Sequence, residues 1–158
     1  MIAETPRLHI VHGNAVAALQ RGDIDILGHQ VNLRGVMGAG IARQIKGAFP
    51  PAFALYREAI DQHALSLGDV QLLQVGPSRW IANIAGQNGI GWRVGPQTDY
   101  AALKCAFGKL AELTEGTTLR IGLPYGIGCG LAGGDWDIVS QIIAERLPQA
   151  MLYWLLEV

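Results

Sequence analysis

The chain has 158 residues, of which 50% are apolar and 16% are charged, and its formal net charge is −1. This composition excludes a disordered chain and predicts one domain with a sizeable core. The twelve Lys and Arg residues are scattered along the sequence. That distribution argues against direct binding of duplex nucleic acid, which would require a basic stripe.

The sequence also lacks the signals of a membrane or secreted protein. No apolar run approaches the roughly 18 residues that span a bilayer, and the first ten residues lack the pattern of a signal peptide. The two cysteines, Cys105 and Cys129, do not make a disulfide framework. We therefore expect a cytoplasmic monomer that does not contact a membrane.

Strand and helix patterns alternate in the first half of the chain. We expect strands at 7–12 and 25–31, and helices at 15–21, 38–49 and 52–60. Ile41, Ala42, Ile45 and Phe49 share one face of the helix at 38–49, and the pair of prolines that follows ends this helix.

The second half begins with two strands separated by a short turn. The expected elements are strands at 69–75, 79–85, 118–123 and 150–158, and helices at 99–113 and 135–147, the latter capped by Asp135. Such alternation predicts one α/β domain over residues 1–158. Its architecture would be a three-layer α/β/α sandwich with a mixed, mainly parallel central sheet.

Glycine is the unusual feature of the composition, with 21 residues in the chain. One cluster, at 35–40, follows the strand at 25–31, and another, at 122–134, begins within the strand at 118–123 and continues past it. Because ligands of open α/β sheets bind outside the carboxyl ends of the strands, these two loops predict a binding site.

Glycine-rich loops that open onto a helix present backbone N–H groups to an anion. Two facing loops could therefore hold a diphosphate. No glycine is followed by the Lys-Ser or Lys-Thr of a P-loop. The segment "GCGLAG" (128–133) matches G-x-G-x-x-G, but no acidic residue lies about 20 positions further on, as a dinucleotide fold requires.

Four segments together carry a family resemblance: "HGN" (12–14), "HQVNLRGVMGAGIARQIKGAFP" (29–50), "IANIAGQ" (81–87) and "YGIGCGLAGGDWDIV" (125–139). In this order and spacing they resemble a macrodomain, the ADP-ribose-binding α/β/α module. "MGAGIA" is similar to the branch that includes the terminal ADP-ribose protein glycohydrolase and the ADP-ribose 1''-phosphate phosphatase. The resemblance implies ADP-ribose or an ADP-ribosylated substrate as ligand, with no cofactor.

The resemblance also implies roles for individual residues. Asn32 matches the residue that faces the distal ribose. Gly13 and Asn14 occupy the place of a Gly-Asp pair that binds adenine in many macrodomains. The residues expected to contact the distal ribose and the diphosphate are Gly35, Val36, Met37, Gly38, Ala39, Gly40 and Ile41 in the first loop and Gly126, Ile127, Gly128, Cys129, Gly130 and Leu131 in the second.

The catalytic positions depart from the glycohydrolase pattern. The lysine and aspartate of that branch are replaced here by Gly86 or Gln87 and by Ala132. His29 is the expected general acid or base, because a histidine occurs there in both related enzymes and titrates near neutral pH; the alternative is a structural strand histidine. Gln87 and Asn88 are candidates to position water, and Asn32, His29 or the substrate's own phosphate are the alternatives. The sequence shows no metal-ligand constellation.

Trp92 lies in a polar, glycine-rich loop, where an aromatic side chain could cover the distal ribose or the adenine. Two functions follow from the resemblance. The first is hydrolysis of an ADP-ribose derivative at the distal ribose, with an ADP-ribosylated carboxylate side chain, O-acetyl-ADP-ribose or ADP-ribose 1''-phosphate as substrate. The alternative is a non-catalytic module that reads or sequesters ADP-ribose or a related nucleotide signal.

Overall fold

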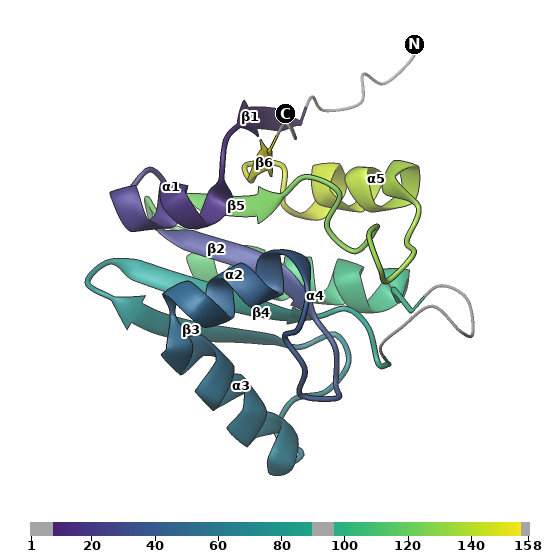
Figure 1. Ribbon diagram of the computed structural model, residues 1–158. Coiled ribbons are helices and arrows are strands. Elements are labelled where there is room, and N and C mark those ends of the chain that lie inside the picture. The colour runs from purple at the N-terminus through teal and green to yellow at the C-terminus, as the bar shows by residue number, and fades with distance from the viewer. Residues whose placement is uncertain (1–7, 90–96, 156–158) are drawn as a thin grey trace.

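The computed structural model describes residues 8–89 and 97–155 (Figure 1). Six strands form a single sheet in the order β1-β6-β5-β2-β4-β3, in which only β3 runs antiparallel to its neighbour. The strands are β1 (His9–His12), β2 (Ile26–Val31), β3 (Val70–Gly76), β4 (Arg79–Ala85), β5 (Ile121–Pro124) and β6 (Met151–Trp154).

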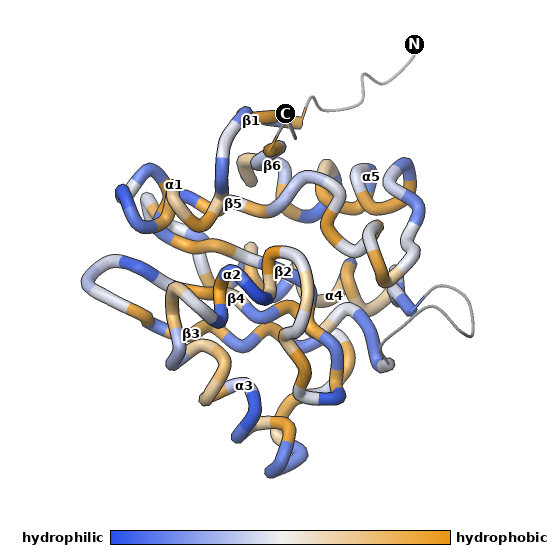
Figure 2. The backbone as a smooth tube through the Cα atoms, viewed as in Figure 1, coloured by the Kyte–Doolittle hydropathy of each residue, from blue (hydrophilic) through white to orange (hydrophobic). Residues whose placement is uncertain are grey.

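Helices cover both faces of the sheet. They are α1 (Ala15–Arg21), α2 (Gly40–Ala48), α3 (Pro50–Asp61), α4 (Tyr100–Thr114) and α5 (Trp136–Arg146). The buried residues of α4 and α5 pack on one face with Ile26 of β2, whereas α1, α2 and α3 bury theirs on the other face, where Leu27 lies. Apolar segments accordingly concentrate along the strands and the inner sides of the helices (Figure 2). The predicted three-layer α/β/α sandwich is confirmed.

Several predicted bounds differ from the structure. Gly38 and Ala39 belong to the loop before α2, because Ala39 has extended backbone angles and serves as the N-cap. The segment before β5 is not paired as a strand, since Arg120 instead bonds to Asp25 through its main chain and its guanidinium. β6 is shorter than expected, ending at Trp154. Asp135 caps α5 as predicted, its carboxylate accepting from the Asp137 amide at 2.9 Å.

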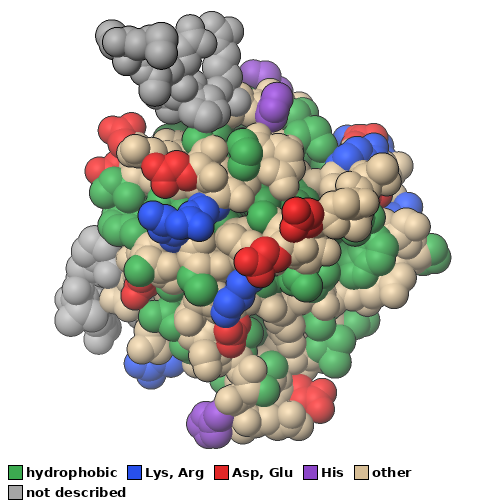
Figure 3. Space-filling model, turned by 180° about the vertical axis from the view of Figure 1, so that it is seen from behind, with side chains coloured by type: hydrophobic (Ala, Val, Ile, Leu, Met, Phe, Trp, Pro, Cys, Tyr) green, Lys and Arg blue, Asp and Glu red, His purple; other side chains and the backbone are tan. Residues whose placement is uncertain are grey.

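The surface behind the view of Figure 1 carries basic side chains that stand apart and are interleaved with acidic ones (Figure 3). This dispersed pattern agrees with the scatter of Lys and Arg in the sequence. Over the described ranges, no helix has the length and apolar character needed to cross a membrane.

Candidate functional site

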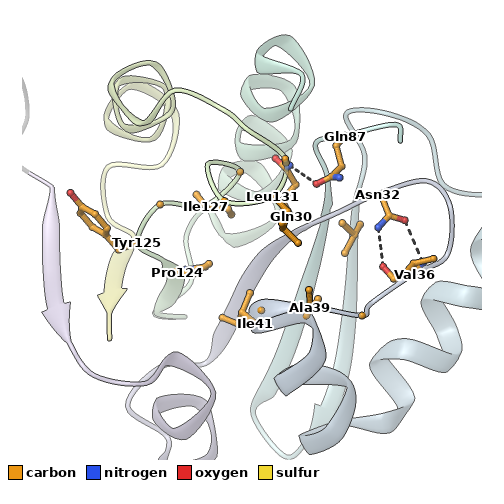
Figure 4. Close-up of a pocket in the computed structure, with 18 residues that line it drawn as sticks. Gln30, Asn32, Val36, Ala39, Ile41, Gln87, Pro124, Tyr125, Ile127 and Leu131 are labelled. Atoms are coloured by element: carbon orange, nitrogen blue, oxygen red, sulfur yellow. Dashed lines mark hydrogen bonds between the residues drawn. The ribbon is translucent and has the colours of Figure 1, made fainter. Parts of the chain in front are cut away.

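A pocket of about 510 Å³ opens at the carboxyl ends of β2 and β5, between the two glycine-rich loops (Figure 4). Twelve predicted site residues line it: Asn32, Val36, Gly38, Ala39, Gly40, Ile41, Gln87, Gly126, Ile127, Gly128, Gly130 and Leu131. Its other lining residues are Gln30, Val31, Ala42, Pro124, Tyr125 and Ala132. The topology therefore brings together two loops that are about ninety residues apart in the chain.

Asn32 shapes the first loop (Figure 4). Its Oδ1 accepts from the Arg34 amide at 2.9 Å, and its Nδ2 donates to the Val36 carbonyl at 2.9 Å. Over the described residues, the second N–H of this amide group has no hydrogen-bond partner. Asn32 can therefore hold the loop and still donate one hydrogen bond to a ligand.

Tyr56, a buried residue of α3, supports the first loop from behind. Its hydroxyl lies 2.6 Å from the Asn32 carbonyl and 2.7 Å from Asn32 Oδ1, and it accepts from the Gly35 amide at 3.2 Å. Burial raises the pKa of Tyr56 to about 12, so the hydroxyl keeps its proton. Sequence reasoning missed this residue, because its spacing on α3 is that of an ordinary core position.

The first loop ends at the N-terminus of α2. No side chain caps this helix, and the amides of Gly38 and Ala39 donate to no residue that the structure describes. The opening N–H groups of a helix lack intrahelical partners and carry partial positive charge. A Cβ added at Gly38 would meet only a Val36 methyl group, at 3.6 Å. Contacts with other protein atoms therefore do not explain why this residue is a glycine.

The second loop is a series of tight turns. Gly126 and Gly128 have φ angles of +80° and +76°, which glycine adopts readily. Within the described part of the chain, the amides of Gly128, Gly130 and Leu131 donate no hydrogen bond. Free main-chain N–H groups thus line the pocket on both sides, and this arrangement suits a diphosphate.

Tyr125 at one end of the pocket belongs to an aromatic stack. Tyr125 lines the pocket and stacks on Trp154, with 5.0 Å between ring centroids and an interplanar angle of 16°. Trp136 lies against the same tyrosine at 4.7 Å in a tilted arrangement. Trp154 is 42% exposed, and the His12 ring also lies against it, with 5.6 Å between ring centroids and an interplanar angle of 34°.

His29 lies outside the pocket. It is fully buried, and its Nε2 is 2.6 Å from Oδ1 of Asn83 on β4. Asn83 Nδ2 in turn donates to Gln71 Oε1, which places the Asn83 oxygen toward His29 and makes Nε2 the protonated nitrogen. Burial lowers the pKa of His29 to about 4. The imidazole is therefore neutral and faces the layer of α1–α3, opposite to Gln30.

Several other predicted site residues do not line the pocket. Asn14 caps α1, accepting from the Ala17 amide at 2.9 Å, and neither it nor Gly13 lines the pocket. Gly35, Met37 and Cys129 belong to the loops but are not lining residues. Burial raises the pKa of Cys129 to about 11, which disfavours a thiolate. Trp92 falls outside the described residues.

The described lining of the pocket contains no charged side chain. No group of three or more potential metal ligands occurs over residues 8–89 and 97–155. Within the described residues, the site can therefore attract an anion through main-chain N–H groups and the N-terminus of α2.

Comparison with known proteins identifies the fold. The model of the Macro domain family matches residues 29–143, and the chain belongs to this family. The chain is 32% identical over 145 residues to a DNA ADP-ribosyl glycohydrolase of Thermus aquaticus, an alignment that covers 89% of the chain and 38% of that protein. The chain thus spans less than two fifths of the length of the curated relatives it matches.

Two solved structures resemble this one closely. A Bacteroides thetaiotaomicron protein of unknown function has a TM-score of 0.82 and 28% identity, covering 94% of this chain and 99% of its own. The macrodomain of Mycobacterium tuberculosis DarG has a TM-score of 0.73 and 26% identity, covering 96% of this chain and 100% of its own.

Proposed function

We propose that this macrodomain binds ADP-ribose in the pocket and hydrolyses a bond at its distal ribose. The observation that carries the proposal is the pair of facing loops whose free amides line the pocket at Gly38, Ala39, Gly128, Gly130 and Leu131. Membership in the Macro domain family supports ADP-ribose as the ligand that contains this diphosphate.

The pocket has two chemically different ends, and these orient the ligand. Asn32 and Gln87 offer amide groups at one end, which suit the hydroxyls of the distal ribose. Pro124 and Tyr125 line the other end, and their apolar surface would suit the adenine. The diphosphate would then lie between the N-terminus of α2 and the second loop.

The names of the relatives favour a nucleic acid carrier. The Thermus aquaticus relative is a DNA ADP-ribosyl glycohydrolase, so we propose ADP-ribose attached to DNA as the first substrate to test. A modified carboxylate side chain, O-acetyl-ADP-ribose and ADP-ribose 1''-phosphate are the other candidates, because each also has its scissile bond at the distal ribose.

Hydrolysis at C1'' would proceed as follows. The water oxygen bonds to C1'' as the bond from C1'' to the leaving atom breaks; the leaving atom keeps the electron pair and receives a proton from the water. Asn32 and Gln87 would position the water, and their neutral amides take up no proton. His29 has no part in this proposal, since it is buried away from the pocket lining.

The rival function is a reader that binds ADP-ribose without turnover. The uncharged lining favours it, because Gln87 and Ala132 line the pocket. The resemblance to the protein glycohydrolase branch implies a lysine at the position of Gly86 or Gln87 and an aspartate at that of Ala132. Neither Gln87 nor Ala132 can act as a nucleophile or a general base.

One set of assays separates the two functions. ADP-ribose is titrated by calorimetry, and the protein is then incubated with ADP-ribosylated DNA, a glutamate-ADP-ribosylated protein and ADP-ribose 1''-phosphate. Micromolar binding with release of ADP-ribose from one carrier supports hydrolysis and identifies the substrate. Micromolar binding without turnover of any carrier supports the reader, and absence of binding contradicts both.

A further inference from the structure

Gln30 contacts Gln87 and Thr98 through one amide group. It projects from β2 between the two loops (Figure 4). Its Nε2 lies 2.8 Å from Gln87 Oε1 and 3.0 Å from Thr98 Oγ1. Gln87 follows β4 and Thr98 precedes α4, so this side chain joins three segments that are distant in the sequence.

The directions of these hydrogen bonds are fixed by the groups at their far ends. Gln87 Nε2 donates to the Gly89 carbonyl at 2.8 Å, so its oxygen must face Gln30. The Thr98 hydroxyl donates to the Gly128 carbonyl at 2.6 Å, so its oxygen must accept from Gln30. Two directed chains therefore start at the Gln30 NH₂ group, and one of them ends in the second glycine-rich loop.

Two glycines pack directly against the Gln30 carbonyl oxygen. A Cβ added at Gly86 would lie 2.5 Å from Gln30 Oε1, and one added at Gly128 would lie 2.9 Å from it. These are closer than van der Waals contact allows, so Gln30 fills space that side chains at both positions would require. The glycines at 86 and 128 thus let the backbone approach this one side chain.

We infer that Gln30 is a positioning residue that holds Gln87 and the second glycine-rich loop in the geometry that binds the ligand. The effect of Gln30 on ADP-ribose binding rests on the proposed function. In that function the loop contributes the free amides of Gly128 and Leu131, and Gln87 faces the distal ribose. Gln30 acts through these groups and takes no part in bond breaking. Because the glutamine NH₂ group supplies both bonds, neither leucine nor glutamate can replace it.

The first test needs no ligand. Gln30→Leu removes both donors at similar size, and Gln30→Glu keeps the shape but presents only acceptors to two acceptor oxygens. The matched controls are Gln74→Leu and Gln74→Glu. Gln74 is an exposed glutamine of β3, and among the described residues its amide donates to the Gly76 carbonyl alone, at 3.3 Å. The readout is the backbone amide resonance of each residue in the free protein.

Both Gln30 variants should shift the amide resonances of Gly89 and Gly128, and the Gln74 variants should leave them in place. Unchanged resonances at both glycines in a folded Gln30 variant would overturn the inference, whether or not the protein binds ADP-ribose. If Gln30→Leu does not fold, Gln30→Glu supplies the same comparison.

The second test measures ADP-ribose binding by calorimetry. Gln30→Leu should weaken it about tenfold, as expected when two hydrogen bonds of ordinary strength no longer hold the loop. On the Thr98→Val background the same change should cost much less, because the chain to Gly128 is already broken. Full additivity of the two losses would contradict positioning through Thr98. Wild-type protein that fails to bind would contradict the proposed function, while the amide resonances would still decide the role of Gln30.

Discussion

Gln30 and His29 are neighbours in β2, yet their side chains leave the strand on opposite faces and join different polar networks. Gln30 starts two hydrogen-bond chains, one ending at the Gly89 carbonyl and one at the Gly128 carbonyl in the second glycine-rich loop. His29 starts a chain that is buried at its own end and runs through Asn83 and Gln71 to the exposed Leu55 carbonyl of α3.

The comparison shows that residue type alone does not identify the functional side chain. Histidine is the more reactive of the two residues, but the alternation of the strand directs it into the core and directs the neutral glutamine toward the site. Changes on the core side should therefore affect stability and spare binding, and changes on the pocket side should do the reverse. Four predictions test this division.

The largest effect is expected from Asn83→Ala, on the core side. This change leaves the buried His29 N–H without its acceptor, which costs about 3 kcal/mol of unfolding free energy. Urea denaturation measures the loss, and the ADP-ribose affinity of the folded variant should stay within about twofold of wild type. Gln71→Ala, which removes only the outer end of the same chain, is the milder control. An Asn83→Ala protein of unchanged stability but weakened ADP-ribose binding would contradict the assignment of the His29 face of β2 to stability and of the Gln30 face to binding.

Gly38→Val is the corresponding change on the pocket side. A Cβ at this position meets only a Val36 methyl group, at 3.6 Å, and Gly38 lines the pocket, so the valine side chain should occupy space where the phosphates would bind. We expect binding to fall at least about a hundredfold, or about 2.7 kcal/mol, with the thermal unfolding midpoint retained. Calorimetry and thermal unfolding check the two parts. An unchanged affinity for ADP-ribose would show that the diphosphate does not bind at the N-terminus of α2.

Acid should act through the core side. Burial lowers the pKa of His29 to about 4 in the folded protein, whereas an unfolded histidine titrates near 6.5. The contribution of His29 is therefore complete above pH 6.5 and is lost as the pH falls from 6.5 toward 4, by about 2 kcal/mol at pH 5. Asp25 and Asp69, whose carboxyl pKa values are lowered, contribute to the pH dependence of stability only at lower pH. The pH dependence of urea unfolding should be flatter in His29→Gln; identical slopes in the two proteins would exclude His29 as its source.

The smallest effect is expected from Tyr56→Phe. Tyr56 is buried in the core, and its hydroxyl contacts the first loop of the pocket. Loss of the hydroxyl frees the Asn32–Gly35 turn, and we expect about 1 kcal/mol of lost stability together with a severalfold loss of affinity. Tyr153→Phe is the matched control, because the Tyr153 hydroxyl has no hydrogen bond to a described residue. Equal behaviour of the two variants would show that Tyr56 does not support the loop.

Much of the fold could be predicted from the sequence. Period-two and helical spacing identified the six strands and five helices that residues 8–89 and 97–155 form. The errors lie at element ends such as 118–120, where Arg120 pairs with Asp25 instead of joining the sheet. The two glycine loops were predicted to meet because both follow parallel strands. Twelve of the predicted residues line the pocket for that reason.

The polar residues of the site were harder to predict. Gln30 was missed because glutamine in a strand is usually a solvated side chain, and only the register of β2 between β4 and β5 brings it to Gly86 and Gly128. Asn14 was expected at the adenine, but its oxygen caps α1. Location in the cytoplasm, the monomeric state and the role of Trp92 stay predictions.

The central claim is that main-chain amides of two facing loops hold the diphosphate, and an amide-resolved NMR titration with ADP-ribose tests it most directly. We expect saturable shifts that are largest at Gly38–Ile41 and Gly128–Leu131, with His29 and Asn83 unaffected. Saturable binding whose largest shifts fall outside both loops, or the absence of any shift at millimolar ADP-ribose, would contradict it.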